Sequence, residues 1–443
     1  MHRREFARIA AGVAAASVFQ VSFTPKALSR VQETVQRGAA LSPGEFASNE
    51  DLWRDVKQAF SISRSIINLD NGNVSPSPKI VTEAMVRNLW LEEESPGYAI
   101  YDVELPQTIS MVKDMAVQFG CSLDEIAIVR NATEALTIVL LGVELKPGDE
   151  MLTTTHDYWA MQEALDQRAL REGVVVKRVP VPAPASSMEQ LVAIFERGIT
   201  PHTRLILLSH PVNLTGQFFP VKQICEMAHA RGIEVCVDGA QGFAHMDFKR
   251  DDLDCDYFGT SLHKWLLAPI GTGMLYIKKE KIGKVWPLVP APPDMKNTML
   301  KFMHWGTFSP APFLAISDAL AFHNTIGSKR KEERLRYLTS CWVKRLSKLR
   351  GVKFLTSFSS PAMSCGLATF QLEGVEPELL QRFLQREHSI MVQSISSQSF
   401  SSRLAPEIHG IRVTPNVYTT LDELDRFCEV VEQVASKGLP KSS

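Results

Sequence analysis

The 443-residue chain lacks several features that would assign it to a class at once. It has no internal apolar run of the roughly 20 residues that a membrane-spanning helix requires. Its formal net charge is only -1, which argues against a nucleic-acid-binding surface. No internal repeat is present. The remaining composition, 45% hydrophobic and 22% charged, is that of an ordinary globular protein with two or more domains.

The chain also lacks any cysteine pattern with metal-binding or disulfide spacing. Its seven cysteines are scattered, and the odd number argues against a complete disulfide framework. Most of them stand in apolar surroundings, which predicts buried thiols and no metal site. These cysteines are Cys121, Cys225, Cys236, Cys255, Cys341, Cys365 and Cys428.

The N-terminus differs from the rest of the chain. Arg3 and Arg4 precede a stretch of small and apolar residues at positions 9–19. This pattern predicts a twin-arginine export signal over residues 1–28, and the alternative is an amphipathic or disordered N-terminal helix. Because such a signal directs export, the sequence predicts a periplasmic or otherwise exported protein.

Short apolar strands alternate with helical segments through the middle of the chain. This alternation predicts an α/β fold with a mostly parallel, seven-stranded sheet and helices on both faces. The composition changes after residue 277, and the later strands and helices predict a smaller α/β C-terminal domain. We expect four segments: a signal (1–28), a linker and N-terminal part of the small domain (29–69), a large domain (70–300) and a small domain (301–443).

Two strand-like runs end in residues that carry chemistry. Residues 233–237 lead into Asp238, and a later run leads into Ser261-Leu262-His263-Lys264. Lysine is normally a solvated surface residue, so one in a loop between two apolar strands indicates a special role. An aspartate and a lysine at such strand ends suit an enzyme of pyridoxal 5'-phosphate (PLP). The lysine would form a Schiff base, and the aspartate would pair with the pyridinium nitrogen.

These residues, together with Gly239-Ala240-Gln241 and Gly271-Thr272-Gly273, resemble the signature of class V aminotransferase-fold PLP enzymes. Cysteine desulfurases and isopenicillin N epimerase belong to that group. The resemblance extends from about residue 69 to residue 431. It implies a fold-type I PLP-dependent transferase that binds an amino acid and forms a homodimer. The Asp238 and Lys264 pair is specific for the fold family and does not define the reaction.

The resemblance extends to the cofactor's phosphate and ring. Strand 126–129 is followed by a turn and a helix start at Ala132 and Thr133, where free N–H groups and the helix dipole favour a phosphate. The alternative is a plain turn between strand and helix. Tyr158 is our choice for a ring stacked on the cofactor, with His156 second. A tyrosine packed under a helix is the alternative.

Further roles follow from the resemblance alone. Ser261 and His263 would bind the phosphate, and Gln241 would donate a hydrogen bond to the phenolic oxygen. Asn213 would lie near that oxygen or near the substrate carboxylate. Thr307 would reach the phosphate bound by the partner subunit.

Two residues are expected to contact the substrate. Arg412 would grip its α-carboxylate with two parallel hydrogen bonds, unless it is a strand arginine in a surface ion pair. Asn71 belongs to a turn-rich segment that resembles the loop leading into the family's active site. A plain turn is the alternative there.

The reaction is indicated less directly. The amine of Lys264 has to be neutral to react, and once freed it can move the α-proton. A desulfurase needs a reactive cysteine shortly before the arginine, but residues 387–409 contain none, and Cys365 lies too far upstream. The segments around Asn71 and His156 favour an isopenicillin N epimerase-like enzyme. An aminotransferase or C–S lyase remains an alternative. A non-catalytic exported binding protein is another, against which the intact Asp238 and Lys264 pair argues.

Overall fold

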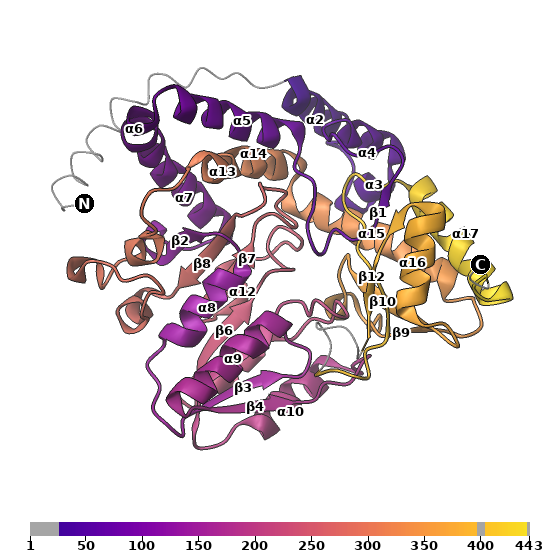
Figure 1. Ribbon diagram of the computed structural model, residues 1–443. Coiled ribbons are helices and arrows are strands. Elements are labelled where there is room, and N and C mark those ends of the chain that lie inside the picture. The colour runs from indigo at the N-terminus through magenta and orange to yellow at the C-terminus, as the bar shows by residue number, and fades with distance from the viewer. Residues whose placement is uncertain (1–25, 397–403, 441–443) are drawn as a thin grey trace.

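The computed structural model describes residues 26–396 and 404–440 of the chain. At its centre is a seven-stranded sheet with the order β2-β8-β7-β6-β5-β3-β4 (Figure 1). Only β8 runs against the others, pairing antiparallel with both β2 and β7. The predicted mostly parallel sheet is therefore confirmed. Its strands are β2 (Ile126–Val129), β3 (Glu150–Thr154), β4 (Val175–Val179), β5 (Thr203–Ser209), β6 (Glu234–Asp238), β7 (Tyr257–Ser261) and β8 (Gly273–Ile277).

Helices cover both faces of this sheet, as the apolar strands require. Successive side chains of a strand point to opposite faces, so in β6 Val235 and Val237 enter one apolar core and Cys236 enters the other. The core with Cys236 contains α8 (Ala132–Gly142) and α9 (Trp159–Glu172). The opposite core contains α5 (Lys79–Glu94), α7 (Leu105–Phe119), α10 (Met188–Gly198), α11 (Val221–His229) and α14 (Ile316–Ile326).

A second region is built around an antiparallel four-stranded sheet with the order β12-β13-β10-β9. Its apolar core is shared with three helices, so the predicted smaller α/β region is present. Its elements are α15 (Ser328–Leu346), β9 (Val352–Phe354), β10 (Ala368–Leu372), α16 (Pro377–His388), β12 (Gln393–Ile395), β13 (Gly410–Val413) and α17 (Leu421–Lys437). The division of the chain at residues 69 and 300 stays a prediction.

The N-terminal part of the described chain packs against this second region (Figure 1). Strand β1 (Ile67–Asn68) pairs in parallel with β11 (Ile390–Met391). The fully buried Arg334 forms an ion pair with Glu50 and donates a hydrogen bond of 3.0 Å to the carbonyl of Ala47. The helices here are α2 (Lys26–Arg37), α3 (Pro43–Ser48) and α4 (Glu50–Lys57).

The predicted linker is therefore helical over much of its length. The polar composition of this segment had indicated a linker. Each helix buries only one side, through apolar residues such as Val31, Phe46 and Trp53, and leaves most of its polar residues at least partly exposed. Residues 1–25 of the predicted export signal lie outside the described residues, so that signal stays a prediction.

Short helices complete the described chain. Within residues 26–396 and 404–440, every helix is too short or too polar to cross a bilayer. All seven cysteines are free thiols, and five of them are buried. The short helices are α6 (Pro96–Tyr98), η1 (Ala99–Glu104), η2 (Leu123–Glu125), α12 (Arg250–Leu253), η3 (Lys279–Lys284), η4 (Pro293–Met295), η5 (Met299–Met303), α13 (Ala311–Leu314) and η6 (Pro361–Met363).

Candidate active site

A cavity of about 220 Å³ lies at the carboxyl ends of the parallel strands. Ser209, Asp238 and Ser261, the last residues of β5, β6 and β7, all line it. Open α/β sheets bind ligands at this edge, because the loops that follow the strands converge there. Ten of the predicted site residues line this one cavity: Ala132, Thr133, Tyr158, Asn213, Asp238, Gln241, Ser261, His263, Lys264 and Arg412.

The cavity has two chemically different parts. We call Ala132, Thr133, Asp238, Ser261 and Lys264, which come from the large sheet and its loops, the sheet side. We call Arg412 with its contacts Asn73, Asn213 and Asp70 the arginine side; Asp70 contacts Arg412 but does not belong to the cavity lining.

Asp238 and Lys264 dominate the electrostatics of the sheet side. Asp238 is only 4% exposed, and its Oδ1 accepts a hydrogen bond of 3.0 Å from the N–H of Ala240. Burial raises the pKa of Asp238 to about 6, although the backbone hydrogen bond and Lys264 act in the opposite direction. Burial likewise lowers the pKa of Lys264 to about 8, against the attraction of Asp238. Desolvation thus outweighs the pairing at both groups, and a neutral Lys264 amine becomes accessible near neutral pH.

The start of α8 provides the anion-binding end of the sheet side. Asn131 caps the helix by accepting a hydrogen bond of 2.9 Å from the N–H of Glu134. The N–H of Ala132 donates to Ser261 Oγ at 3.0 Å, so this group is engaged within the protein. Thr133 is the second residue of the helix, and its N–H has no carbonyl partner in its own helix. The Ser261 hydroxyl and the Thr133 N–H are therefore the groups placed to meet a phosphate.

Gly273 allows the helix start to lie this close to the sheet. A Cβ at this position would lie 2.6 Å from Asn131 Cα and 2.7 Å from the neighbouring backbone atoms. A clash with backbone cannot be relieved by turning a side chain, so only glycine fits here without displacing the capping residue.

Three other predicted residues have distinct surroundings in the cavity. Gln241 is held at both ends of its amide: its Nε2 donates to the Gly72 carbonyl at 2.8 Å and its Oε1 accepts from Trp265 Nε1 at 2.8 Å. A bond to the cofactor's phenolic oxygen would have to use the second N–H of that amide. Burial lowers the pKa of His263 to about 4 and raises the pKa of Tyr158, so both rings are neutral at pH 7.

Three predicted residues do not line the cavity. The fully buried Asn71 donates to the Thr414 carbonyl at 2.9 Å and accepts from the Tyr418 hydroxyl at 2.5 Å. Its carboxamide thus fixes the backbone. His156 is buried, with its Nε2 2.6 Å from Glu407 Oε1.

Thr307 also lies elsewhere, on the surface. Its Oγ1 is 3.3 Å from the hydroxyl of the exposed Tyr101.

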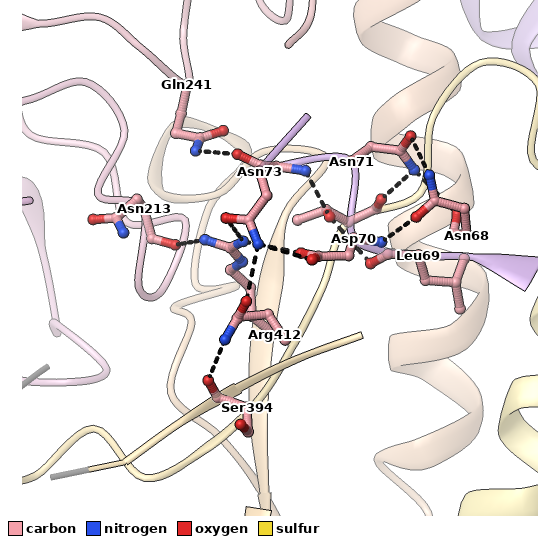
Figure 2. A network of polar contacts seen from close by, with 12 residues as sticks. Asn68, Leu69, Asp70, Asn71, Asn73, Asn213, Gln241, Ser394 and Arg412 are labelled. Carbon is pink, nitrogen blue, oxygen red and sulfur yellow. Dashed lines mark hydrogen bonds and ion pairs between the residues drawn. The ribbon is translucent and has the colours of Figure 1, made fainter. Parts of the chain in front are cut away.

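The arginine side centres on a nearly buried guanidinium (Figure 2). Arg412, in β13, is 3% exposed. Its Nη2 donates to Asp70 Oδ1 at 3.1 Å and to Asn73 Oδ1 at 3.0 Å, and its Nη1 donates to the Asn213 carbonyl at 3.1 Å. Asp70 and Asn73 were not predicted as site residues. The turn around Asn71 indicated the segment, but turn chemistry does not tell which side chain faces the cavity.

Comparison with known proteins gives this arrangement a context. The sequence profile of the aminotransferase class-V family matches residues 67–427. The chain belongs to this family. It is 28% identical to an isopenicillin N epimerase from Amycolatopsis lactamdurans over 403 residues, which cover 86% of this chain and 98% of that protein. It is 25% identical to a probable cysteine desulfurase from Methanothermobacter thermautotrophicus over 410 residues, covering 89% and 100% of the two chains.

Solved structures agree on the fold. A cysteine desulfurase from Escherichia coli superposes with a TM-score of 0.75 at 21% identity, covering 90% of this class-V chain and all of that chain. An apo cysteine desulfurase from Thermococcus onnurineus superposes with a TM-score of 0.74 at 22% identity, covering 87% and 98%. The predicted fold-type I architecture is therefore confirmed.

The predicted cofactor, PLP, is confirmed at the level of the family, and the cavity of this class-V chain fits it. Asp238 is placed for a ring nitrogen, Lys264 supplies an amine, and Thr133 with Ser261 offers a phosphate site. In addition, Asn213 Oδ1 and His263 Nδ1 are buried without a hydrogen-bond partner among the described residues. Buried polar atoms are rarely left unpaired, so these two indicate a missing polar ligand.

Proposed function

We propose that this PLP-dependent class-V enzyme binds an amino acid and moves its α-proton in an epimerase-like reaction. One observation carries the proposal: a single cavity brings together the amine of Lys264, the carboxyl group of Asp238 and the guanidinium of Arg412. These are the groups needed for proton transfer, for control of the cofactor ring and for recognition of a carboxylate.

Each residue has a defined task in this proposal. The guanidinium of Arg412 binds the α-carboxylate and thereby orients the α-carbon. The neutral fraction of Lys264, whose pKa burial lowers to about 8, accepts the α-proton. When bound, the cofactor supplies a ring that accepts the electron pair left on the α-carbon. The ionised carboxylate of Asp238 favours a proton on the ring nitrogen.

The sequence around the arginine favours an epimerase-like reaction over desulfuration. Similarity alone does not separate the two, because isopenicillin N epimerases and a probable cysteine desulfurase align over 98–100% of their lengths at 25–28% identity. Residues 387–409 contain no cysteine before the arginine. Cys365 is buried, and burial raises the pKa of its thiol to about 12, which removes the thiolate that such chemistry requires.

We also propose export by the twin-arginine route and assembly as a homodimer. The export proposal is supported by Arg3 and Arg4 ahead of the small, apolar residues 9–19. The exposed position of Thr307 leaves it free to approach a partner subunit. Cell fractionation and sedimentation of the purified protein test the two proposals separately.

The function is tested first by absorption spectroscopy of the purified protein beside Lys264→Ala. We expect the visible band of bound PLP in the wild type and its loss or shift in the variant. Incubation with single amino acids in deuterium oxide then reveals α-proton exchange, and chiral analysis separates racemised product from keto acid or released sulfide. Absence of the band after PLP is added would contradict the proposed enzyme, and transamination or sulfur release would contradict the epimerase-like reaction.

A further inference from the structure

The guanidinium that should bind the substrate carboxylate already has partners in the free protein (Figure 2). Arginine has five N–H donors, and three of those on Arg412 are used. Both donors of Nη2 are taken, one by Asp70 Oδ1 and one by Asn73 Oδ1. Nη1 uses one donor on the Asn213 carbonyl. Nε is buried and has no hydrogen-bond partner among the described residues.

This pattern of occupied donors determines what an incoming carboxylate must do. A carboxylate binds a guanidinium with two parallel hydrogen bonds, either end-on to Nη1 and Nη2 or side-on to Nε and Nη2. Both modes require Nη2. A substrate carboxylate can therefore form the two-bond contact with Arg412 only after Asp70 or Asn73 has released that nitrogen.

Charge identifies Asp70 as the group that leaves. If Asp70 stayed, two carboxylates would share one nitrogen, and like charges at that distance repel strongly. Asn73 is neutral and causes no such repulsion. Asp70 also acts on the other reacting group, because its charge opposes the lowering of the pKa of Lys264.

We propose that Asp70 is a built-in competitor of the substrate: it occupies Arg412 in the free enzyme and yields Nη2 when an amino acid binds. The proposal deepens the function proposed above, and it rests on that function only in assigning the carboxylate site to Arg412. Asp70 would then lower the affinity of the site for every carboxylate and keep weakly bound anions out.

The surroundings of Asp70 allow its side chain to move without its backbone. The backbone is held by a hydrogen bond of 3.0 Å from its N–H to Asn68 Oδ1 and by a strand-like bridge to Thr414. The side chain is 19% exposed, and its Oδ2 accepts only from Asn73 Nδ2, at 2.8 Å, among the contacts of the described residues. Asn73 Nδ2 also donates to Gln393 Oε1 at 2.9 Å, so Asn73 stays anchored when Asp70 turns toward solvent.

Such competition would set how tightly any carboxylate binds. The cost of displacing Asp70 is the same for every carboxylate, so it raises all dissociation constants by one factor and leaves their ratios unchanged. A small carboxylate gains only its contact with Arg412, so this cost leaves the site largely unoccupied at low concentrations of such anions. An amino acid gains further contacts in the cavity and still binds.

The test uses sodium propionate, a carboxylate without an amine, titrated into the PLP-loaded full-length protein at constant ionic strength. Isothermal titration calorimetry gives its dissociation constant for the wild type, for Asp70→Asn and for a control, Asp55→Asn. Asp55 pairs with Arg37 on the surface, so the control removes the same charge far from the cavity. We expect about tenfold tighter propionate binding to Asp70→Asn, which corresponds to about 1.4 kcal/mol. The amide oxygen can still accept from Nη2, but it lacks the charge that strengthens the bond of a carboxylate to arginine, so propionate displaces it more easily. The control should bind propionate like the wild type.

A reciprocal variant keeps the test decisive if Asp70→Asn folds poorly because Arg412 loses its ion-pair partner. Asn73→Asp places a second carboxylate on the same nitrogen, and we expect about tenfold weaker propionate binding. Unchanged or weaker binding to Asp70→Asn, or unchanged binding to Asn73→Asp, would overturn the competition and make Asp70 a residue that only positions Arg412. The absence of propionate binding to any variant would overturn it as well. Since propionate cannot react, none of these results depends on turnover, so a failed search for the reaction leaves this test intact.

Discussion

The two sides of the cavity handle charge in opposite ways. On the sheet side, Asp238 and Lys264 are shifted by burial toward their neutral forms, and burial outweighs their mutual attraction. On the arginine side, the guanidinium of Arg412 is paired with Asp70, and Asp70 and Asn73 both accept hydrogen bonds from its Nη2. The reacting groups thus have pKa values shifted toward neutral pH, whereas the recognition group has its Nη2 donors occupied. Removal of a group should therefore affect the chemical step on the first side and substrate affinity on the second.

The largest expected effect comes from the sheet side. Lys264→Ala should lower α-proton exchange by about a thousandfold or more, since proton transfer by a positioned side chain contributes about 10²–10⁴-fold. Deuterium incorporation into an amino acid substrate measures the effect. The matched control is Lys301→Ala, because Lys301 is also buried, with its pKa lowered to about 8, but it binds the Ile282 and Lys296 carbonyls. An equal loss of exchange in folded Lys301→Ala would contradict the assignment.

On the arginine side, Arg412→Lys should raise KM by about 10- to 100-fold, in line with the loss of a charged hydrogen bond worth about 1.5–3 kcal/mol. The value of kcat should fall much less, because lysine keeps the charge but not the two-bond geometry. Steady-state kinetics separate the two parameters. The control is Arg178→Lys, because Arg178 lies in β4 and pairs with Asp166 of α9. A fall in kcat with unchanged KM would contradict the expectation that the arginine side acts on substrate affinity and not on the chemical step.

A pair of glycine substitutions compares the rigidity of the two sides. Gly273→Ala should cost about 1–3 kcal/mol by overpacking, because its Cβ would meet the backbone of Asn131. We also expect weaker PLP binding. Gly72→Ala should cost less, since its Cβ would meet the Thr414 methyl at 3.0 Å and Arg412 atoms at 3.5 Å, which are side chains that can shift. Thermal unfolding and PLP titration measure both variants, and equal losses would show that the two sides are equally rigid.

A last prediction concerns the pH dependence of stability. Lys264 holds its proton with a pKa of about 8 in the folded chain against 10.5 for an unperturbed lysine. Between these values the unfolded chain binds more protons, so the contribution of Lys264 to the free energy of unfolding rises with pH. Cofactor-free Lys264→Met should therefore be more stable than the wild type below pH 8, by a margin that shrinks toward pH 10.5. Urea unfolding across this range measures the margin, and a constant margin would mean that burial does not shift this lysine.

The sheet side was predictable from the sequence because its signals are local. Asp238 and Ser261 end neighbouring strands, and the ends of parallel strands converge whatever chain lies between them. Thr133 follows a strand and opens a helix, which is a local signal as well. These positions needed only the order of strands and helices.

The arginine side was only partly predictable. Arg412 was identified from its segment, but its partner Asp70 lies 342 positions away, and the pairing depends on how the four-stranded sheet meets the turn after β1. The same turn shows a second limit: Asn71 was chosen, yet its carboxamide bonds Thr414 and Tyr418, while Asn73 faces the cavity. The side chains of an irregular turn do not alternate regularly as those of a strand do. Which of them faces the cavity is therefore decided by tertiary contacts.

The sources of the two sides also imply an order of events during synthesis. Residues 132–264 supply every group of the sheet side, whereas Arg412 enters from β13 near the end of the chain. The ribosome therefore releases all groups of the sheet side well before it makes Arg412, the residue proposed to hold the substrate. A nascent chain can fold its earlier parts first. A ribosome-bound chain that ends after β8 would contain the amine of Lys264 but not the guanidinium of Arg412. Such a chain would bind the carboxylate of cellular amino acids poorly, so reaction with them would be disfavoured until translation is nearly complete.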